Sequence, residues 1–174
     1  MKKLLISAGA VAALALTSAP AAATPVSATA NAKAKIFMPL TLAQVKGADL
    51  DFATIVMGTY TGTSNVVVAQ DGSLTSCGTG LTCSGTTAAA QFTAKGTSKA
   101  DLAITLPSST VSLTDGVLGD PALTVTLDAP MTANLGSAGP TTGVTFGVGG
   151  SLAVPSGTID GFYSGTFTVD ADYQ

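Results

Sequence analysis

Short runs of alternating apolar and polar residues, separated by turn residues, follow one another along most of the chain. A period of two with frequent Val, Thr and Phe predicts half-buried β-strands. No stretch after residue 23 shows a convincing period of 3.6, so the sequence predicts an all-β fold. Roughly eight to ten strands in one domain predict a sandwich of two antiparallel sheets. The expected strands cover residues 35–42, 50–56, 65–70, 89–95, 102–106, 111–113, 123–127, 144–154 and 161–174.

The clearest alternation is the run GFYSGTFTVDADYQ, residues 161–174. Three aromatic side chains and a valine fall on one face, while serine, threonine and aspartate fall on the other. Burying the four large side chains contributes roughly 6–10 kcal/mol before any opposing cost. We therefore expect this run to lie in a sheet with its polar face in water. The expected apolar face consists of Tyr163, Gly165, Phe167, Val169, Ala171 and Tyr173.

A second alternation, in which most of the apolar residues are alanine, lies near the amino end. Alanine buries a single methyl group, so backbone hydrogen bonds would supply most of the affinity if this segment paired with a sheet. Two interpretations stay open: a thin strand that enters a narrow groove, or a disordered leader before the first strand. The apolar positions of this segment are Val26, Ala28, Ala30, Ala32, Ala34 and Ile36.

The first 23 residues have the three parts of a secretory signal peptide. Two lysines precede an apolar run (4–16) that is too short to span a bilayer, and three alanines (21–23) form a small-residue cleavage site. We therefore expect export to the periplasm, the cell surface or the extracellular space. The expected organisation is a signal peptide at 1–23, an N-terminal extension or candidate donor strand at 24–36, and a β-sandwich domain at 37–174.

The charged residues exclude several classes of function. After residue 23 the chain has five Lys and ten Asp, and it lacks Arg, Glu and His throughout. An acidic chain without Arg has no basic surface for nucleic acid or anionic lipid, and no later apolar run is long enough to span a membrane. Without His there is no Ser-His or Cys-His pair. We expect no enzyme activity and no cofactor.

Aspartates are the remaining candidates for metal chemistry. Asp49 and Asp51, and likewise Asp170 and Asp172, fall on one face of an expected strand. Such pairs are able to contact calcium, but a solvated polar face explains them more simply. We therefore expect no metal site.

The two cysteines, Cys77 and Cys83, lie close together in the sequence. An even number of cysteines in an exported chain predicts a disulfide. The closed loop is short, so the bond is expected to stabilise the fold by roughly 2–2.5 kcal/mol. Because no Lys or His lies nearby to lower a thiol pKa, we interpret the pair as a local staple on a loop or hairpin end.

The carboxyl end resembles the C-terminal signature of chaperone–usher pilus subunits. Tyr173 is penultimate, Gly161 is fourteenth from the end, and apolar residues alternate between them. More of the chain resembles a family of exported bacterial proteins known only as a domain of unknown function, close to the pilin and adhesin sandwiches. That resemblance is carried by PLTL (39–42), LDFATI (50–55), GVGGSLAV (147–154) and GFYSGTFTVDADY (161–173). It implies an immunoglobulin-like fold.

The resemblance also implies a mode of assembly. In pilins the last strand of the sandwich is missing, and an apolar groove beside the C-terminal strand is filled by a chaperone and then by the N-terminal extension of the next subunit. We therefore expect a non-enzymatic, pilin-like surface or periplasmic subunit that binds itself or a periplasmic chaperone by β-strand addition. Two alternatives stay open. The chain folds its own N-terminal strand back, or it is a monomeric secreted sandwich that binds a small ligand or glycan through its loops.

Overall fold

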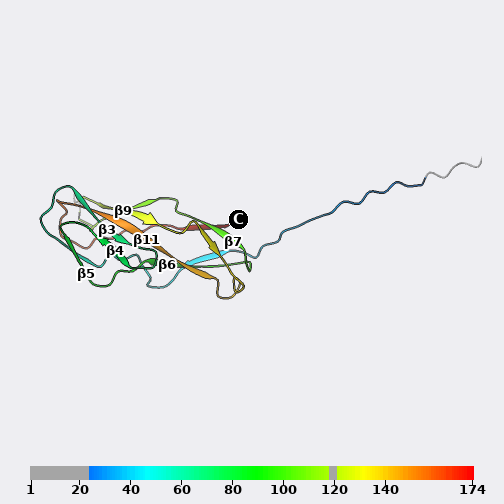
Figure 1. Cartoon of the computed structure of the whole chain (residues 1–174), viewed down its shortest axis with the longest axis horizontal. Coiled ribbons are helices and arrows are strands. Elements are labelled where there is room, and N and C mark those ends of the chain that lie inside the picture. Colours follow the sequence, from blue (N-terminus) through cyan, green and yellow to red (C-terminus); the bar gives the residue numbers. More distant parts are fainter. Residues whose placement is uncertain (1–23, 118–120) are drawn as a thin grey trace, which may run out of the picture. The chain divides into compact units, whose positions relative to one another are not determined.

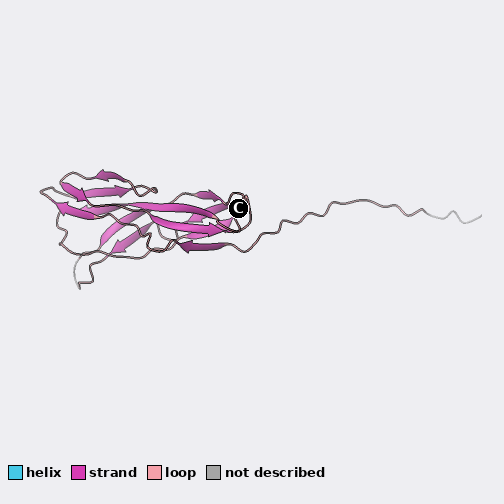
Figure 2. Cartoon of the chain, turned by 90° about the horizontal axis from the view of Figure 1, so that it is seen from below, coloured by secondary structure: helices cyan, strands magenta, loops and turns pink. Residues whose placement is uncertain are grey.

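The computed structural model of the protein describes residues 24–117 and 121–174. The expected signal peptide lies outside the described residues. By their contacts, residues 36–174 form one compact unit that contains the whole hydrophobic core. Every regular element in the described ranges is a strand, as Figure 2 shows. Those ranges contain no helix with the length and apolar character that a bilayer crossing requires.

The described residues form twelve strands (Figure 1). They are β1 (Thr41–Gln44), β2 (Thr54–Met57), β3 (Thr63–Val68), β4 (Leu74–Cys77), β5 (Leu81–Ser84), β6 (Ala90–Lys95), β7 (Asp101–Thr105), β8 (Thr110–Leu113), β9 (Leu123–Asp128), β10 (Thr132–Asn134), β11 (Val144–Pro155) and β12 (Asp170–Tyr173).

The strands pair into three antiparallel sheets. The largest has the order β1-β6-β11-β3-β4, and β9 joins it by pairing with β11 on one side and β8 on the other. A second sheet has the order β10-β7-β12, and β2 pairs with β5 in a two-stranded sheet. Among the described strands, β1 pairs only with β6 and β12 only with β7, so each keeps one unpaired edge.

The core lies between the two larger sheets. Val66, Val125 and Val148 from the largest sheet are fully buried and belong to the same cluster as Leu102 and Ile104 of β7. Each burial follows from the alternation of its strand; β9, for example, alternates strictly between buried and exposed positions. The predicted all-β antiparallel fold is confirmed, and two sheets around one core make it a sandwich.

Strand β11 connects the parts of the largest sheet. Its first half, Val144 to Val148, pairs with β6, and its second half pairs with both β9 and β3. The Gly-Gly at 149 and 150 does not end the strand, because pairing continues without a register shift through both positions. A Cβ atom at Gly149 would collide with the carbonyl oxygen of Val68 and with the backbone of Ala69. Glycine is therefore required where three strands come this close.

Three expected strands differ clearly in extent from the observed ones. The run expected at 161–174 is a strand only at Asp170–Tyr173, and upstream of it the pairing is limited to one bridge between Ser164 and Thr114. The run expected at 35–42 becomes a strand only from Thr41, after Pro39, which has no N–H to donate to a ladder. The run expected at 50–56 is shortened to Thr54–Met57, because Ala53 adopts the left-handed conformation with φ 59°. Strands β4, β5 and β10 were not predicted. β4 is exposed at every position and shows no alternation of burial.

The predicted disulfide between Cys77 and Cys83 is present and connects the end of β4 to β5. Its Cα atoms are 6.0 Å apart, and both flanking strands are short. The bond therefore closes the short loop between β4, which pairs with β3, and β5, which pairs with β2, and it is the local staple that the sequence predicts.

Replacing both cysteines by serine is expected to lower the free energy of unfolding by about 2 kcal/mol, because the unfolded chain regains the entropy of a short loop. Urea denaturation of the oxidised protein and of the double variant measures the difference. The reduced wild-type protein is the control and should match the variant. Equal midpoints for the oxidised protein and the variant would contradict this prediction.

Candidate functional site

The C-terminal segment lies along the strands β7 and β8. Strand β12 pairs with β7, with Tyr173 opposite Leu102, and upstream Ser164 pairs with Thr114 through two hydrogen bonds of 2.9 Å. The alternation read from the sequence appears in the burial of this segment. Tyr163, Phe167, Val169, Ala171 and Tyr173 are buried or half-buried, and Gly165 is exposed. The intervening residues Ser164, Thr166, Thr168, Asp170 and Asp172 are all exposed.

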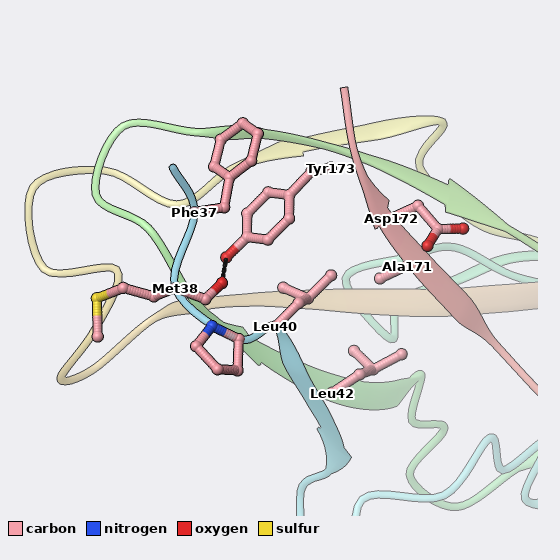
Figure 3. A pocket seen from close by; sticks show the side chains of 8 residues that line it. Phe37, Met38, Leu40, Leu42, Ala171, Asp172 and Tyr173 are labelled. Atoms are coloured by element: carbon pink, nitrogen blue, oxygen red, sulfur yellow. Dashed lines mark hydrogen bonds between the residues drawn. The ribbon is translucent and has the colours of Figure 1, made fainter. Parts of the chain in front are cut away.

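A groove separates the unpaired edges of β1 and β12. Its first part encloses about 490 Å³. Leu40, just before β1, Leu42 of β1 and Ala171 of β12 point into this space (Figure 3). Within the described ranges, no strand pairs with the second edge of β1 or of β12, the two strands that flank this space. The lining residues are Phe37, Met38, Pro39, Leu40, Leu42, Ala171, Asp172 and Tyr173.

One end of the groove is closed by a group that we call the clasp: Phe37, Met38, Thr97 and Tyr173. The Tyr173 ring stacks on Phe37 with centroids 4.3 Å apart. Its hydroxyl donates to the Met38 carbonyl at 2.8 Å, drawn in Figure 3, and accepts from the Thr97 N–H at 2.8 Å. A Cβ atom at Gly96 would collide with that hydroxyl. The clasp therefore joins the two rims of the groove at this end.

Replacing Tyr173 by Phe is expected to lower the free energy of unfolding by roughly 1–3 kcal/mol, because the Thr97 N–H and the Met38 carbonyl both lose their partner. Thermal or urea denaturation measures the change. Tyr163→Phe is the matched control, since its hydroxyl donates to the Ile159 carbonyl, four residues away in the same loop. A Tyr173→Phe protein no less stable than the control would show that the clasp contributes nothing.

A second, wider pocket of about 980 Å³ lies between residues 49–57 on one side and residues 158–167 on the other. Each pocket is thus bordered by an early segment and a late segment of the β-domain. The floor of the wider pocket consists of core side chains, so the interior of the sandwich is partly uncovered here. The floor residues are Ala90, Phe92, Val111, Leu113, Leu123, Val125, Leu152 and Val154.

One aromatic contact connects the largest sheet to the C-terminal segment. Phe92 of β6 lies 6.0 Å from the Phe146 ring and 6.2 Å, edge to face, from the Phe167 ring. Phe92 and Phe167 are only half-buried. Apolar walls with unpaired backbone edges suit an extended peptide better than a polar small molecule, because such an edge offers a ladder of main-chain hydrogen bonds.

Two aspartates near the groove accept hydrogen bonds from residues close to them in the sequence. Asp49 accepts from the Gln44 side-chain amide at 2.7 Å, and Asp51 accepts from the Ala53 N–H at 2.7 Å. Asp170 and Asp172 face solvent, as the solvated-face interpretation expects. In residues 24–117 and 121–174, no group of three or more His, Cys, Asp or Glu side chains is placed to hold a metal ion.

The candidate donor segment is described apart from the β-domain. Residues 24–35 are exposed and contain no strand, and Val26 is fully exposed. Ile36, the first residue of the compact unit, is 87% exposed. The sequence analysis missed the opposite rim, Phe37 to Leu42, as part of the site. The apolar alternation of Leu40 and Leu42 was the available signal, but nothing in it indicates which strand lies opposite.

The comparisons give a family but no characterised relative. Residues 40–173 match the family model described as DUF4402, a domain of unknown function. Neither a curated protein nor a solved structure matches the chain. The expected membership of a domain-of-unknown-function family is therefore confirmed. No match supports the likeness to chaperone–usher pilins, which is therefore part of the proposal below.

Proposed function

We propose that the chain, which belongs to the DUF4402 family, is a non-enzymatic exported subunit that joins copies of itself by β-strand complementation, as pilins do. Two observations carry the proposal: the groove beside the unpaired edges of β1 and β12, and the wider pocket next along the chain, which leaves core side chains uncovered. An uncovered apolar edge promotes aggregation, so such a groove calls for a covering strand. The disulfide supports export to an oxidising compartment.

The occupant that fits the groove is the segment 26–36 of a second copy. This segment and the accepting run 163–173 both contain eleven residues, so as extended strands they match in length. The donor's inward positions between Val26 and Ile36 are all alanine, so each buries only a methyl group. Backbone hydrogen bonds to the edges of β1 and β12 supply the affinity, and the alternate side chains supply the fit.

Before assembly, the same edges are available to a strand of a periplasmic chaperone. In both cases the partner adds a strand rather than docking on a surface, and no nucleic acid or lipid is involved. Binding of a small ligand or glycan by a closed monomer is the alternative, and the test below separates the two.

The mature chain, residues 24–174, is expected to form multimers that resist detergent until heated. We would run the purified protein on a denaturing gel with and without boiling, and expect a ladder in the unboiled lane that collapses to one band on heating. A single monomer band in both lanes, with a soluble monomer by light scattering, would contradict the proposal and favour the closed monomer.

A matched pair of variants tests the donor strand. Ala30→Asp places a charge on the inward face of the donor and is expected to abolish the ladder, because a carboxylate in an apolar groove is costly. Asn31→Asp places the same charge on the outward face and should retain the ladder. Equal behaviour of the two variants would show that the alternation of residues 26–36 has no role in assembly.

A further inference from the structure

The wider pocket, between residues 49–57 and 158–167, is larger than the candidate donor strand can fill. It encloses about 980 Å³ above a floor of core side chains. Between Val26 and Ile36 the donor's inward positions are all alanine, and a few methyl groups occupy only a small part of that volume. Apolar side chains that line an unfilled space lose dispersion contacts. A strand that covers the mouth of the pocket therefore leaves room for a further apolar occupant.

Aromatic side chains are concentrated in this pocket. The chain has nine aromatic residues, six Phe and three Tyr, and five of them line it. Phe52 is buried, and Phe162 is 98% exposed. The others, Phe92, Tyr163 and Phe167, are half-buried. The depth of the pocket is therefore suited to an apolar group, and one aromatic ring lies at its mouth.

The charged residues that line the pocket are all acidic. They are Asp49, Asp51 and Asp160, and each of them is exposed, which places them at the mouth. Among the residues that the structure describes, no Lys lines the pocket. The carboxylate of a fatty acid would therefore meet like charges at the mouth, whereas a cationic head group would meet opposite charges.

We propose that this pocket binds a cationic amphiphile, with its apolar tail over the core side chains and a quaternary ammonium head at the mouth. The head stays in contact with water, because a cation inside an apolar pocket is costly. Asp49, Asp51 and Asp160 attract the head, and the ring of Phe162 adds a cation–π contact. Burial of the tail supplies most of the affinity, and the charges select the head.

This binding activity goes beyond the proposed function. Strand addition depends on the unpaired backbone edges of β1 and β12, which flank the first groove. The amphiphile instead fills the depth of the wider pocket and needs no backbone edge. The same molecule is therefore able to assemble through its edges and to hold an amphiphile beneath the covering strand.

Isothermal titration with two amphiphiles of equal tail length tests the site. The probes are dodecyltrimethylammonium and laurate, each kept below its micelle concentration. The protein is the mature chain with Ala30→Asp, so that a strand from another copy does not cover the mouth. We expect one dodecyltrimethylammonium per chain, bound about tenfold or more tighter than laurate. The absence of saturable binding, or laurate binding as tightly as the cation, would overturn the proposal.

A matched pair of charge reversals locates the head group. Asp160→Lys is expected to weaken dodecyltrimethylammonium binding by about fivefold or more, and the milder Asp160→Asn to weaken it less. Asp170→Lys is the control, because it changes the net charge equally while Asp170 is exposed and lies outside the pocket. Equal losses for Asp160→Lys and Asp170→Lys would show that the overall charge of the chain attracts the probe, and would overturn the proposal.

The ring at the mouth has its own test. Phe162→Leu retains an apolar side chain but removes the π face, so it is expected to weaken dodecyltrimethylammonium binding by about threefold and to leave laurate binding unchanged. Equal weakening of both probes would show that the ring does not contact the head. Phe162 is 98% exposed, so the fold tolerates the change.

The outcomes are distinguishable from those of the proposed function. A mature chain that forms the heat-sensitive ladder, while its Ala30→Asp form binds no amphiphile, overturns the pocket assignment and leaves strand complementation standing. Saturable binding of dodecyltrimethylammonium by a chain that forms no ladder supports the pocket assignment and contradicts strand complementation.

Discussion

A chain that begins at Ile36 is expected to be a folded monomer that has lost all assembly. Among the residues that the structure describes, every core residue lies within 36–174, so removal of residues 24–35 leaves the core intact. Without a donor strand, no copy can fill the groove of another. Size-exclusion chromatography with light scattering measures the loss, and a thermal melt verifies the fold. We expect the detergent-resistant ladder of the mature chain to disappear completely.

The truncated chain also gives a direct measurement of groove occupancy. Adding a peptide of residues 24–36 should stabilise it by about 2.7 kcal/mol when the free peptide reaches a hundred times its Kd. A peptide of the same composition without the period-two alternation is the control. Assembly of the truncated chain to the extent of the mature chain would place the donor elsewhere, and an unfolded truncated chain would show that residues 24–35 belong to the domain.

Replacing Gly149 by Val is expected to lower the free energy of unfolding by more than about 3 kcal/mol. Any Cβ at this position collides with the Val68 carbonyl and the Ala69 backbone, and backbone atoms held in a ladder cannot move aside as a flexible side chain does. Strand β11 contacts three other strands around this point, so a local shift disturbs the whole sheet. Denaturant unfolding, or the loss of soluble protein, measures the effect.

Gly157→Val is the matched control for this change. It makes the same substitution just after β11, where a Cβ atom has no neighbour within 4 Å and the backbone does not need a positive φ. Its stability should fall by less than about 1 kcal/mol. Comparable losses for the two variants would show that close strand approach is not what requires glycine at position 149.

The sequence predicts most where a strand has one wet face and one buried face. In β9 and in the C-terminal segment, the apolar or polar character of each side chain predicts whether it is buried, and the predicted inward and outward positions agree with the structure. The staple between Cys77 and Cys83 was accessible for a similar reason, because both partners lie in one short loop. Local pattern is sufficient in these cases.

The sequence predicts little about strands whose side chains are all exposed, or about features that depend on pairing between distant segments. Strand β4 is held by pairing with β3 while all its side chains stay exposed, so no alternation reveals it. The left-handed Ala53 ends a run that propensity alone would continue toward Leu50. The groove itself depends on which strands fail to pair, namely β1 and β12, and a single run of sequence carries no sign of its missing neighbour.

The clasp ties residues near the start of the domain to residues at its carboxyl end. Met38 and Tyr173 are 135 positions apart in sequence, and the Tyr173 hydroxyl is the bridge between them. Contacts of such long range slow folding, because a large loop must close before they form. A chain emerging amino end first therefore holds β1 without its opposite rim until the last residues of the domain have been synthesised. Newly made chains pass through a period in which the interior is more open to water than in the finished domain, and that period is when a holding chaperone is most useful.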